Sequence, residues 1–119
     1  MAEMKTYAGG CHCGQVKYEV QTDMAQVVSC NCSICSKRGL LLNFVTPEQF
    51  KPVSGVDSQK LYQFNKKVIE HLFCPTCGVE SYGTGVGPDG KRMFAINVRC
   101  LEGVDLSTLT PMPFNGREM

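Results

Sequence analysis

Three observations predict an all-β protein built from short strands. Apolar and polar residues alternate over several short segments, as they do in strands with one buried face. Twelve glycines and six prolines indicate frequent turns, and no apolar stripe with helical periodicity is long enough for an extended helix. Clustered cysteines indicate metal sites that replace part of a core that would otherwise be thin. We expect one domain spanning residues 1–119.

The expected strands show either this alternation or an apolar run beside a turn signal, and they are residues 16–20, 27–29, 40–45, 60–64, 68–73 and 93–98. Residues 40–45 are mostly apolar, which favours a strand buried on both faces. Residues 87–90 read Gly-Pro-Asp-Gly, a strong turn signal before the last strand. Residues 111–119 are expected to form an irregular tail.

Two short helical turns are also expected. Thr46 is a favourable N-cap, Pro47 suits the first helical position, and Gln49 occupies the position of a capping box. Residues 104–109 form the second expected turn. Neither turn is long enough to provide a helical layer, so the predicted class remains all-β.

Charge and hydropathy argue against several classes of protein. The formal net charge of +1 gives no basic excess for binding nucleic acid or an acidic membrane surface. No apolar stretch has the length of a membrane span, and no signal peptide is expected at the first residues. We therefore expect a cytoplasmic protein, whose reducing surroundings favour metal-binding or catalytic cysteines over disulfides.

Seven of the eight cysteines lie in three tight clusters, within residues 11–13, 30–35 and 74–77. A disulfide framework is the alternative to metal sites. Cysteines two residues apart are poorly placed to bridge each other, and clusters of two, three and two do not pair evenly. The spacing favours metal binding. Four thiolates complete a closed zinc site, whereas three leave a position for a substrate.

Cys74 and Cys77, followed by Gly78, have the spacing of a zinc knuckle. The tight turn lets both sulfurs reach one metal ion, and backbone N–H groups can donate to the thiolates. Gly78 is expected to have a positive φ. The alternative is a redox-active pair, which usually lies at a helix N-terminus, and the β context argues against it.

Cys11 and Cys13 are expected at the end of a strand, where residues i and i+2 point to the same side and can face one metal ion. The knuckle cysteines are their natural partners. The resulting structural zinc would pin the N-terminal hairpin to a late strand. His12 would point the other way, and we expect it not to be a ligand.

Cys30, Cys32 and Cys35 place three thiolates close together, with no fourth ligand next to them in the sequence. If a substrate thiol occupied the fourth position, the zinc could hold it as a thiolate. The other candidates for this position are water and three distant side chains: Cys100, His71 and Glu80.

Those distant residues also have ordinary structural explanations. Cys100, at a strand end, is expected to be a buried small apolar residue. His71 is expected to be a surface residue or a hydrogen-bonded core residue. Glu80 and Tyr82 follow the knuckle and could line a pocket.

With these motifs in view, the chain resembles the glutathione-dependent formaldehyde-activating family, which also contains centromere protein V. Residues 10–16 resemble the family's opening Cys-x-Cys-Gly motif, residues 30–35 its Cys-x-Cys-Ser-x-Cys motif, and residues 73–78 its Phe-Cys-x-x-Cys-Gly motif. Residues 96–102 resemble its late strand and turn. The motifs keep the family's order over about residues 7–110.

The resemblance implies a β-tent-like fold of twisted antiparallel sheets. It implies a structural zinc bound by Cys11, Cys13, Cys74 and Cys77, and a second zinc bound by Cys30, Cys32 and Cys35. It also implies glutathione as the thiol. The implied reaction is that of a carbon–sulfur lyase, which forms or cleaves S-hydroxymethylglutathione.

The sequence differs from many members at two positions that concern the substrate rather than the metal. Asn31 stands where many have His, and Ser36 stands where many have Arg, although Lys37 and Arg38 follow. This basic pair is either a solvated surface pair or the group that binds glutathione carboxylates. The alternative to a lyase is a non-catalytic, zinc-stabilised module that binds glutathione or another protein.

Overall fold

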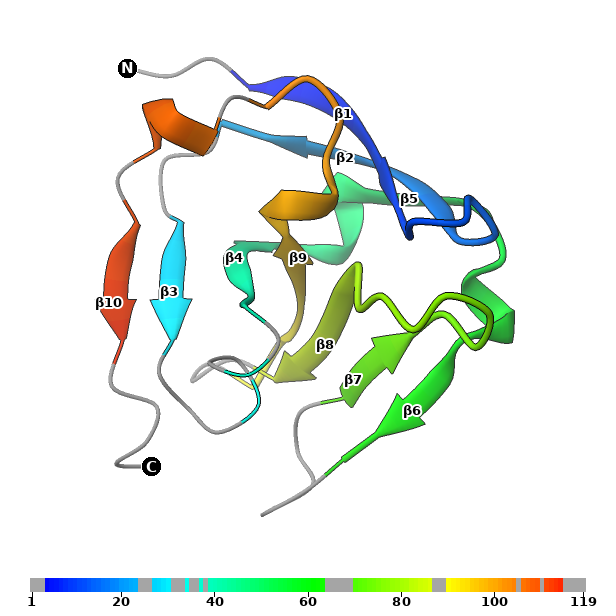
Figure 1. The fold of residues 1–119 in the computed structure, drawn as a ribbon. Helices are drawn as coiled ribbons and strands as arrows, with labels where there is room; N and C mark the ends of the chain where they lie inside the picture. The colour runs from blue at the N-terminus through cyan, green and yellow to red at the C-terminus, as the bar shows by residue number, and fades with distance from the viewer. Residues whose placement is uncertain are drawn as a thin grey trace.

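The computed structural model describes residues 4–23, 27–30, 34, 37, 39–63, 70–86, 90–104, 106–109 and 111–114. These residues form two β-sheets joined by short connections, which confirms the all-β prediction (Figure 1). The helical elements with described bounds are 3₁₀ turns: η1 (Pro47–Gln49), η2 (Val56–Ser58), η3 (Val98–Cys100) and η4 (Leu106–Thr108). Among the described residues, no helix has the length and apolar character needed to span a membrane.

The small sheet contains β1 (Lys5–Gly10), β2 (Lys17–Thr22) and β5 (Phe50–Ser54), in the order β1-β2-β5 with antiparallel pairing. It crosses the top of the view in Figure 1, above the large sheet. Alternate residues of β2 are buried, as the sequence pattern predicts for a strand with one inward face.

The large sheet has the strand order β10-β3-β4-β9-β8-β7-β6. All the paired neighbours are antiparallel except β10 and β3, which run parallel. Its strands in chain order are β3 (Val28–Cys30), β4 (Leu41–Val45), β6 (Lys60–Tyr62), β7 (Glu70–Phe73), β8 (Tyr82–Val86), β9 (Arg92–Asn97) and β10 (Met112–Phe114).

Two expectations about this sheet are wrong. The irregular tail expected over residues 111–119 includes a strand, because β10 pairs with β3 through Met112 N–H, which donates to Val27 O at 2.7 Å. β4 is not buried on both faces, since the Phe44 side chain is 46% exposed. The turn expected over residues 87–90 lies mostly outside the described residues.

The turn η1 follows the sequence prediction. The Thr46 N–H donates to Gln49 Oε1 at 3.0 Å, and the Gln49 N–H donates to Thr46 O at 3.0 Å. These bonds satisfy donors at the start of the turn that would otherwise lack partners. The second expected turn is present as η4.

Aromatic side chains fill the space between the two sheets. The Tyr18 ring lies 5.0 Å from Phe50 and 5.4 Å from Tyr82, and the Phe50 ring lies 4.5 Å from Phe94. The buried Tyr18 hydroxyl donates to Ser81 O at 2.8 Å, so its polar end is satisfied. These contacts join β2 and β5 of the small sheet to β8 and β9 of the large sheet.

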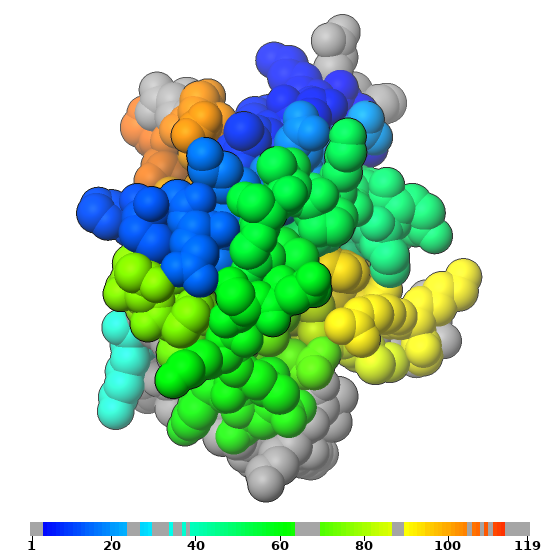
Figure 2. All heavy atoms as spheres, turned by 90° about the vertical axis from the view of Figure 1, so that its right-hand side faces the viewer, coloured from blue at the N-terminus to red at the C-terminus, as the bar shows by residue number. Residues whose placement is uncertain are grey.

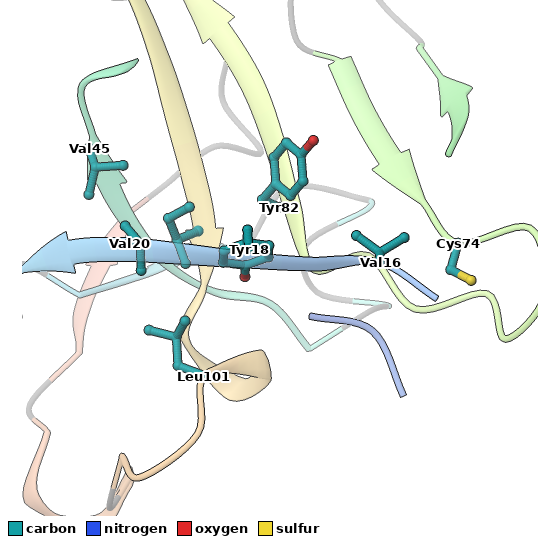
Figure 3. Packing of buried hydrophobic residues seen from close by; sticks show 8 residues of the cluster. Val16, Tyr18, Val20, Val45, Cys74, Tyr82 and Leu101 are labelled. Carbon is teal, nitrogen blue, oxygen red and sulfur yellow. The ribbon is translucent and has the colours of Figure 1, made fainter. Parts of the chain in front are cut away.

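The buried core extends from this interface to the first predicted metal site. Figure 3 shows a row formed by Val16, just before β2, and by Tyr18 and Val20 of β2, with Cys74 beside Val16 at one end. All four side chains are at most 1% exposed. The core therefore supports one of the predicted zinc ligands directly.

Candidate metal centre

Four cysteines from two distant segments meet in one cluster. Cys11 and Cys13 lie between β1 and β2, and Cys74 and Cys77 lie between β7 and β8. Their four sulfur atoms all lie within 4.8 Å of one another, and Cys13 Sγ is 3.6 Å from the sulfurs of both Cys11 and Cys74. Figure 2 shows the two segments, blue and lime, packed against each other.

These distances fit a tetrahedral zinc site. Zinc–sulfur bonds of about 2.3 Å in tetrahedral geometry place neighbouring sulfurs about 3.8 Å apart. A disulfide would require about 2.0 Å. The structure thus brings together the four cysteines that the sequence predicts as one set, at a spacing that suits a metal ion.

The knuckle is built by hydrogen bonds within its own turn. The Gly78 N–H donates to Cys74 O at 2.8 Å, and the Cys74 N–H donates to Val79 O at 3.1 Å. Gly78 has a φ of 80°, which confirms the prediction of a positive φ. The Thr76 N–H donates to Cys74 Sγ at 3.4 Å, as expected for a thiolate ligand in a tight turn.

The first cysteine pair has a different local geometry from the one expected. β1 ends at Gly10, and residues 12–16 form bends rather than a strand end. The turn is closed by the Cys11 N–H, which donates to Val16 O at 3.1 Å. The Val16 N–H donates in return to Cys11 Sγ at 3.3 Å, so this turn also orients a sulfur. His12 is exposed and does not belong to the cluster.

The local environment shifts the pKa values of Cys77 and Cys13 in opposite directions. Burial raises the pKa of Cys77, but hydrogen bonds from the backbone N–H groups of Val79 and Cys13 and the neighbouring thiols outweigh it and lower the pKa to about 6. The Gln15 N–H lowers the pKa of Cys13, but desolvation and the other three thiols together raise it to about 11. Four thiolates so close together repel one another without a cation. The donor set therefore suits a divalent ion such as zinc.

Cys100 lies near this cluster without joining it. It is half-buried and lines a surface hollow of about 600 Å³ together with Cys11, His12 and Cys13. Burial raises the pKa of the Cys100 thiol to about 11, so it remains protonated at neutral pH. Its Sγ lies 3.9 Å from Glu80 O. These observations agree with an apolar packing role rather than a ligand role.

The structure does not place the second predicted zinc site. β3 ends at Cys30, whose side chain lies outside the described part of the structure, as do Cys32, Cys35 and Arg38. Lys37 is exposed. The structure therefore defines only where the chain enters and leaves this segment, at β3 and β4.

His71 and Glu80 form a buried pair that the sequence alone does not reveal. The His71 Nδ1–H donates to Glu80 Oε2 at 3.0 Å, and their side chains are 7% and 3% exposed. His71 is thus a hydrogen-bonded core histidine, one of the two states expected. Tyr82 faces the small sheet, where its hydroxyl accepts a hydrogen bond from Gln59 Nε2 at 2.9 Å.

The fold and the cluster define an all-β protein with a four-cysteine site that fits one zinc ion. Residues 6–112 match the family described as glutathione-dependent formaldehyde-activating enzyme. The chain belongs to this family. Its fold is also similar to the crystal structure of a Rhodobacter sphaeroides protein, with 32% sequence identity and a TM-score of 0.77. That match covers 89% of this chain and 97% of the other.

Proposed function

We propose that the protein is a zinc-dependent carbon–sulfur lyase that forms or cleaves the adduct of formaldehyde and glutathione. The family is described by glutathione-dependent activation of formaldehyde, which supports this substrate class. The observation that carries the proposal is the division of the cysteines. Four of them gather in one cluster, so the three in residues 30–35 remain as a separate set.

The four-cysteine cluster would hold a structural zinc. Four thiolates complete tetrahedral coordination and leave no position for a substrate. The cluster joins the turn before β2 to the turn after β7, and Cys74 is part of the buried core. Its role would be to hold the small sheet in place.

Cys30, Cys32 and Cys35 would hold a second zinc. A zinc with three protein ligands can favour the thiolate form of a substrate thiol. The exposed Lys37 and the adjacent Arg38 would bind the carboxylates of glutathione by charge-assisted hydrogen bonds. A basic pair at this position would orient the tripeptide so that its sulfur reaches the cysteines.

Metal content and exchange kinetics test the proposal. Elemental analysis should find two zincs per chain in the wild type and one in Cys32→Ser. Exchange NMR should show that the zinc-loaded protein accelerates the reaction of formaldehyde with glutathione beyond its rate without protein. Cys32→Ser should lose this acceleration, whereas Cys100→Ser should keep it.

The outcomes separate the two functions considered. If the wild type carries two zincs but leaves the exchange at its uncatalysed rate, the lyase proposal is wrong. Saturable glutathione binding in that same sample would favour the non-catalytic module.

A further inference from the structure

Gln15 joins the two cysteine pairs of the four-cysteine cluster through groups that do not bind the metal. It lies in the bends between β1 and β2, two residues after Cys13, and is half-buried. Its side-chain Oε1 accepts a hydrogen bond from Thr76 Oγ1 at 2.5 Å. Thr76 lies between Cys74 and Cys77 in the knuckle. One side chain thus links two segments that are 61 positions apart.

Each end of this link is connected to a sulfur atom by a backbone N–H group. The Gln15 N–H donates to the sulfur of Cys13. The Thr76 N–H donates to Cys74 Sγ at 3.4 Å, and Gln15 Oε1 lies 4.0 Å from the same sulfur. N–H groups that donate to ligand sulfurs orient the ligands and affect how tightly a metal is held. The bond between Gln15 and Thr76 therefore fixes two such donors relative to each other.

The nitrogen of the Gln15 amide binds η2. Gln15 Nε2 donates to Ser58 Oγ at 3.0 Å, and Ser58 Oγ donates to Gly55 O at 2.7 Å. Gly55 packs so closely on this connection that a Cβ atom there would overlap Gln15 O. In Figure 1 the β1–β2 connection, η2 and the knuckle meet at the right of the view. The two polar atoms of the amide thus serve two directions, one toward the knuckle and one toward η2.

Release of zinc from a four-thiolate site begins when one zinc–sulfur bond breaks. The detached sulfur binds again if it stays close to the metal, and this effective concentration depends on how firmly its segment is held. The bond between Gln15 and Thr76 holds the two cysteine pairs together without help from the metal. Its loss should therefore speed the release of zinc, although none of the four ligands is changed.

We propose that Gln15 is a positioning residue of the metal centre, that its bond to Thr76 slows the release of zinc, and that its bond to Ser58 ties η2 to the same turn. The inference rests on the zinc that the proposed function assigns to the four-cysteine cluster. It adds to that function a residue that is not itself a ligand.

Transfer of zinc to an excess of a chromophoric chelator measures the rate of release. Cys32→Ser is the background for every variant, so that the zinc measured belongs to the four-cysteine cluster. Gln15→Ala should release zinc about 10-fold faster, at the lower end of the usual effect of partners of metal ligands, because the amide is only half-buried. Thr76→Val removes the other half of the bond and should have the same effect. An unchanged rate in Gln15→Ala would overturn the inference.

A double variant distinguishes positioning from a general loss of stability. If Gln15 acts through Thr76, the combination of Gln15→Ala and Thr76→Val should release zinc no faster than the faster single variant. Ser58→Ala removes only the bond to η2 and should keep the background rate. Gln21→Ala, at an exposed glutamine of β2, is the matched control and should keep it too. Effects that multiply in the double variant, or equal rates in Ser58→Ala and Thr76→Val, would contradict an action through the knuckle.

The cobalt form shows whether the set of ligands is unchanged. Co²⁺ can replace zinc in thiolate sites, and its absorption depends on the number and geometry of the sulfur ligands. Every variant should keep the absorption of a four-thiolate site, because no ligand is removed. Loss of this absorption in Gln15→Ala would mean that the residue is needed to form the site, and would refute a role in retaining the metal.

Hydrogen exchange tests the bond to η2. The Ser58 N–H donates to Gly55 O at 3.1 Å, so its exchange reports the opening of this turn. Ser58→Ala and Gln15→Ala should raise the exchange rate in η2 several-fold, whereas Thr76→Val should not. Exchange in η1 should stay the same in all three variants. Equal exchange in η2 for the background and Gln15→Ala would refute the role of this bond.

Failure of the inference differs from failure of the proposed function. A wild type that does not accelerate the reaction of formaldehyde with glutathione refutes the lyase, while the rates of zinc release still decide the role of Gln15. A wild type that accelerates the reaction supports the lyase, and equal zinc release by the background and Gln15→Ala then refutes only the inference. A four-cysteine cluster that holds no zinc refutes both.

Discussion

Replacing Cys74 by serine measures how much the four-cysteine cluster contributes to folding. Cys74 is fully buried, and its sulfur lies 3.6 Å from that of Cys13. A serine oxygen cannot replace the thiolate, so the zinc would be lost. Structural zinc contributes about 10–16 kcal/mol of apparent binding free energy in zinc-finger peptides. A typical domain is stable by about 5–15 kcal/mol. We therefore expect Cys74→Ser to be largely unfolded at 25 °C.

A comparison of serine variants at an exposed and at a buried cysteine separates the effect of losing the zinc from the effect of burying a new polar group. Cys13 is exposed, so Cys13→Ser should lose the zinc without burying a new polar group. Cys74→Ser should cost about 1–3 kcal/mol more, because it also buries a hydroxyl whose zinc partner is gone. Cys100→Ser is the control outside the cluster. It should retain the zinc and lose less than about 1.5 kcal/mol, as for an ordinary half-buried substitution.

Urea unfolding followed by circular dichroism, with zinc measured in the same samples, gives the free energy of unfolding of each variant that remains folded. For the zinc-free variants, the fraction folded without urea gives the free energy of unfolding or its upper limit. A loss below about 2 kcal/mol in Cys74→Ser, close to the range for ordinary single substitutions, would refute a structural zinc site. So would a loss no larger than that of Cys100→Ser. Cys32→Ser should remain folded, and an equal fall in Tm for Cys32→Ser and Cys74→Ser would contradict the proposed division between a structural and a reactive zinc.

Three further predictions concern the core and one turn. Tyr18→Phe should cost about 1 kcal/mol in the free energy of unfolding at pH 8, because the Ser81 carbonyl keeps a second donor from β9; a loss above 3 kcal/mol would be inconsistent with this. Burial raises the pKa of Tyr18 above its ordinary value of 10.0, so its contribution to stability is complete below pH 10 and is lost as the pH rises further. The cost of Tyr18→Phe should accordingly be the same at pH 8 and pH 9 and shrink as the pH rises above 10, and a cost that stays constant up to pH 11 would contradict it. Gly55→Ala should cost more than Gly39→Ala, by about 1–3 kcal/mol: both positions have positive φ, but only the Cβ at Gly55 would overlap the backbone of the β1–β2 connection. Thermal unfolding of the two variants side by side measures this difference.

The sequence located the elements whose signals are local. β2 is recognisable because its alternation reflects one buried face. The knuckle at Cys74 and Cys77 is recognisable because spacing and a following glycine determine its turn. The meeting of the first and third cysteine clusters could be inferred from the number of ligands that zinc requires.

The elements that escaped prediction depend on tertiary contacts. β8 has the sequence Tyr-Gly-Thr-Gly-Val, and its two glycines lower the strand propensity although it lies inside the large sheet. A Cβ atom at Gly83 would lie 2.8 Å from the backbone oxygen of Glu70 in the neighbouring strand and 3.4 Å from Glu80 Oε2, and neither approach can be read from the sequence. β10 pairs with β3, which lies in the first third of the chain, so no signal in the neighbouring sequence indicates that residues 112–114 form a strand.

Contacts between side chains that are distant in the sequence could not be predicted either. His71 and Glu80 are nine residues apart and meet only because the knuckle reverses the chain between β7 and β8. Phe44 belongs to an apolar run, but which of its faces is covered depends on the other strands of the sheet. The alternation of apolar and polar residues predicts which side chains share a face of a strand, but it does not predict which part of the fold covers that face.

The long span of the four-cysteine cluster has a consequence for how the chain is made. Cys13 and Cys74 are separated by 61 positions, and Cys77 is a further ligand. During synthesis the first pair emerges from the ribosome well before its partners, so a complete site cannot capture zinc until the second pair is also free. The entropic free-energy cost of closing a loop rises by only about 0.6 kcal/mol for each doubling of loop length. Insertions between the two pairs should therefore cost the cluster little, and the timing of zinc capture should follow the emergence of residue 77.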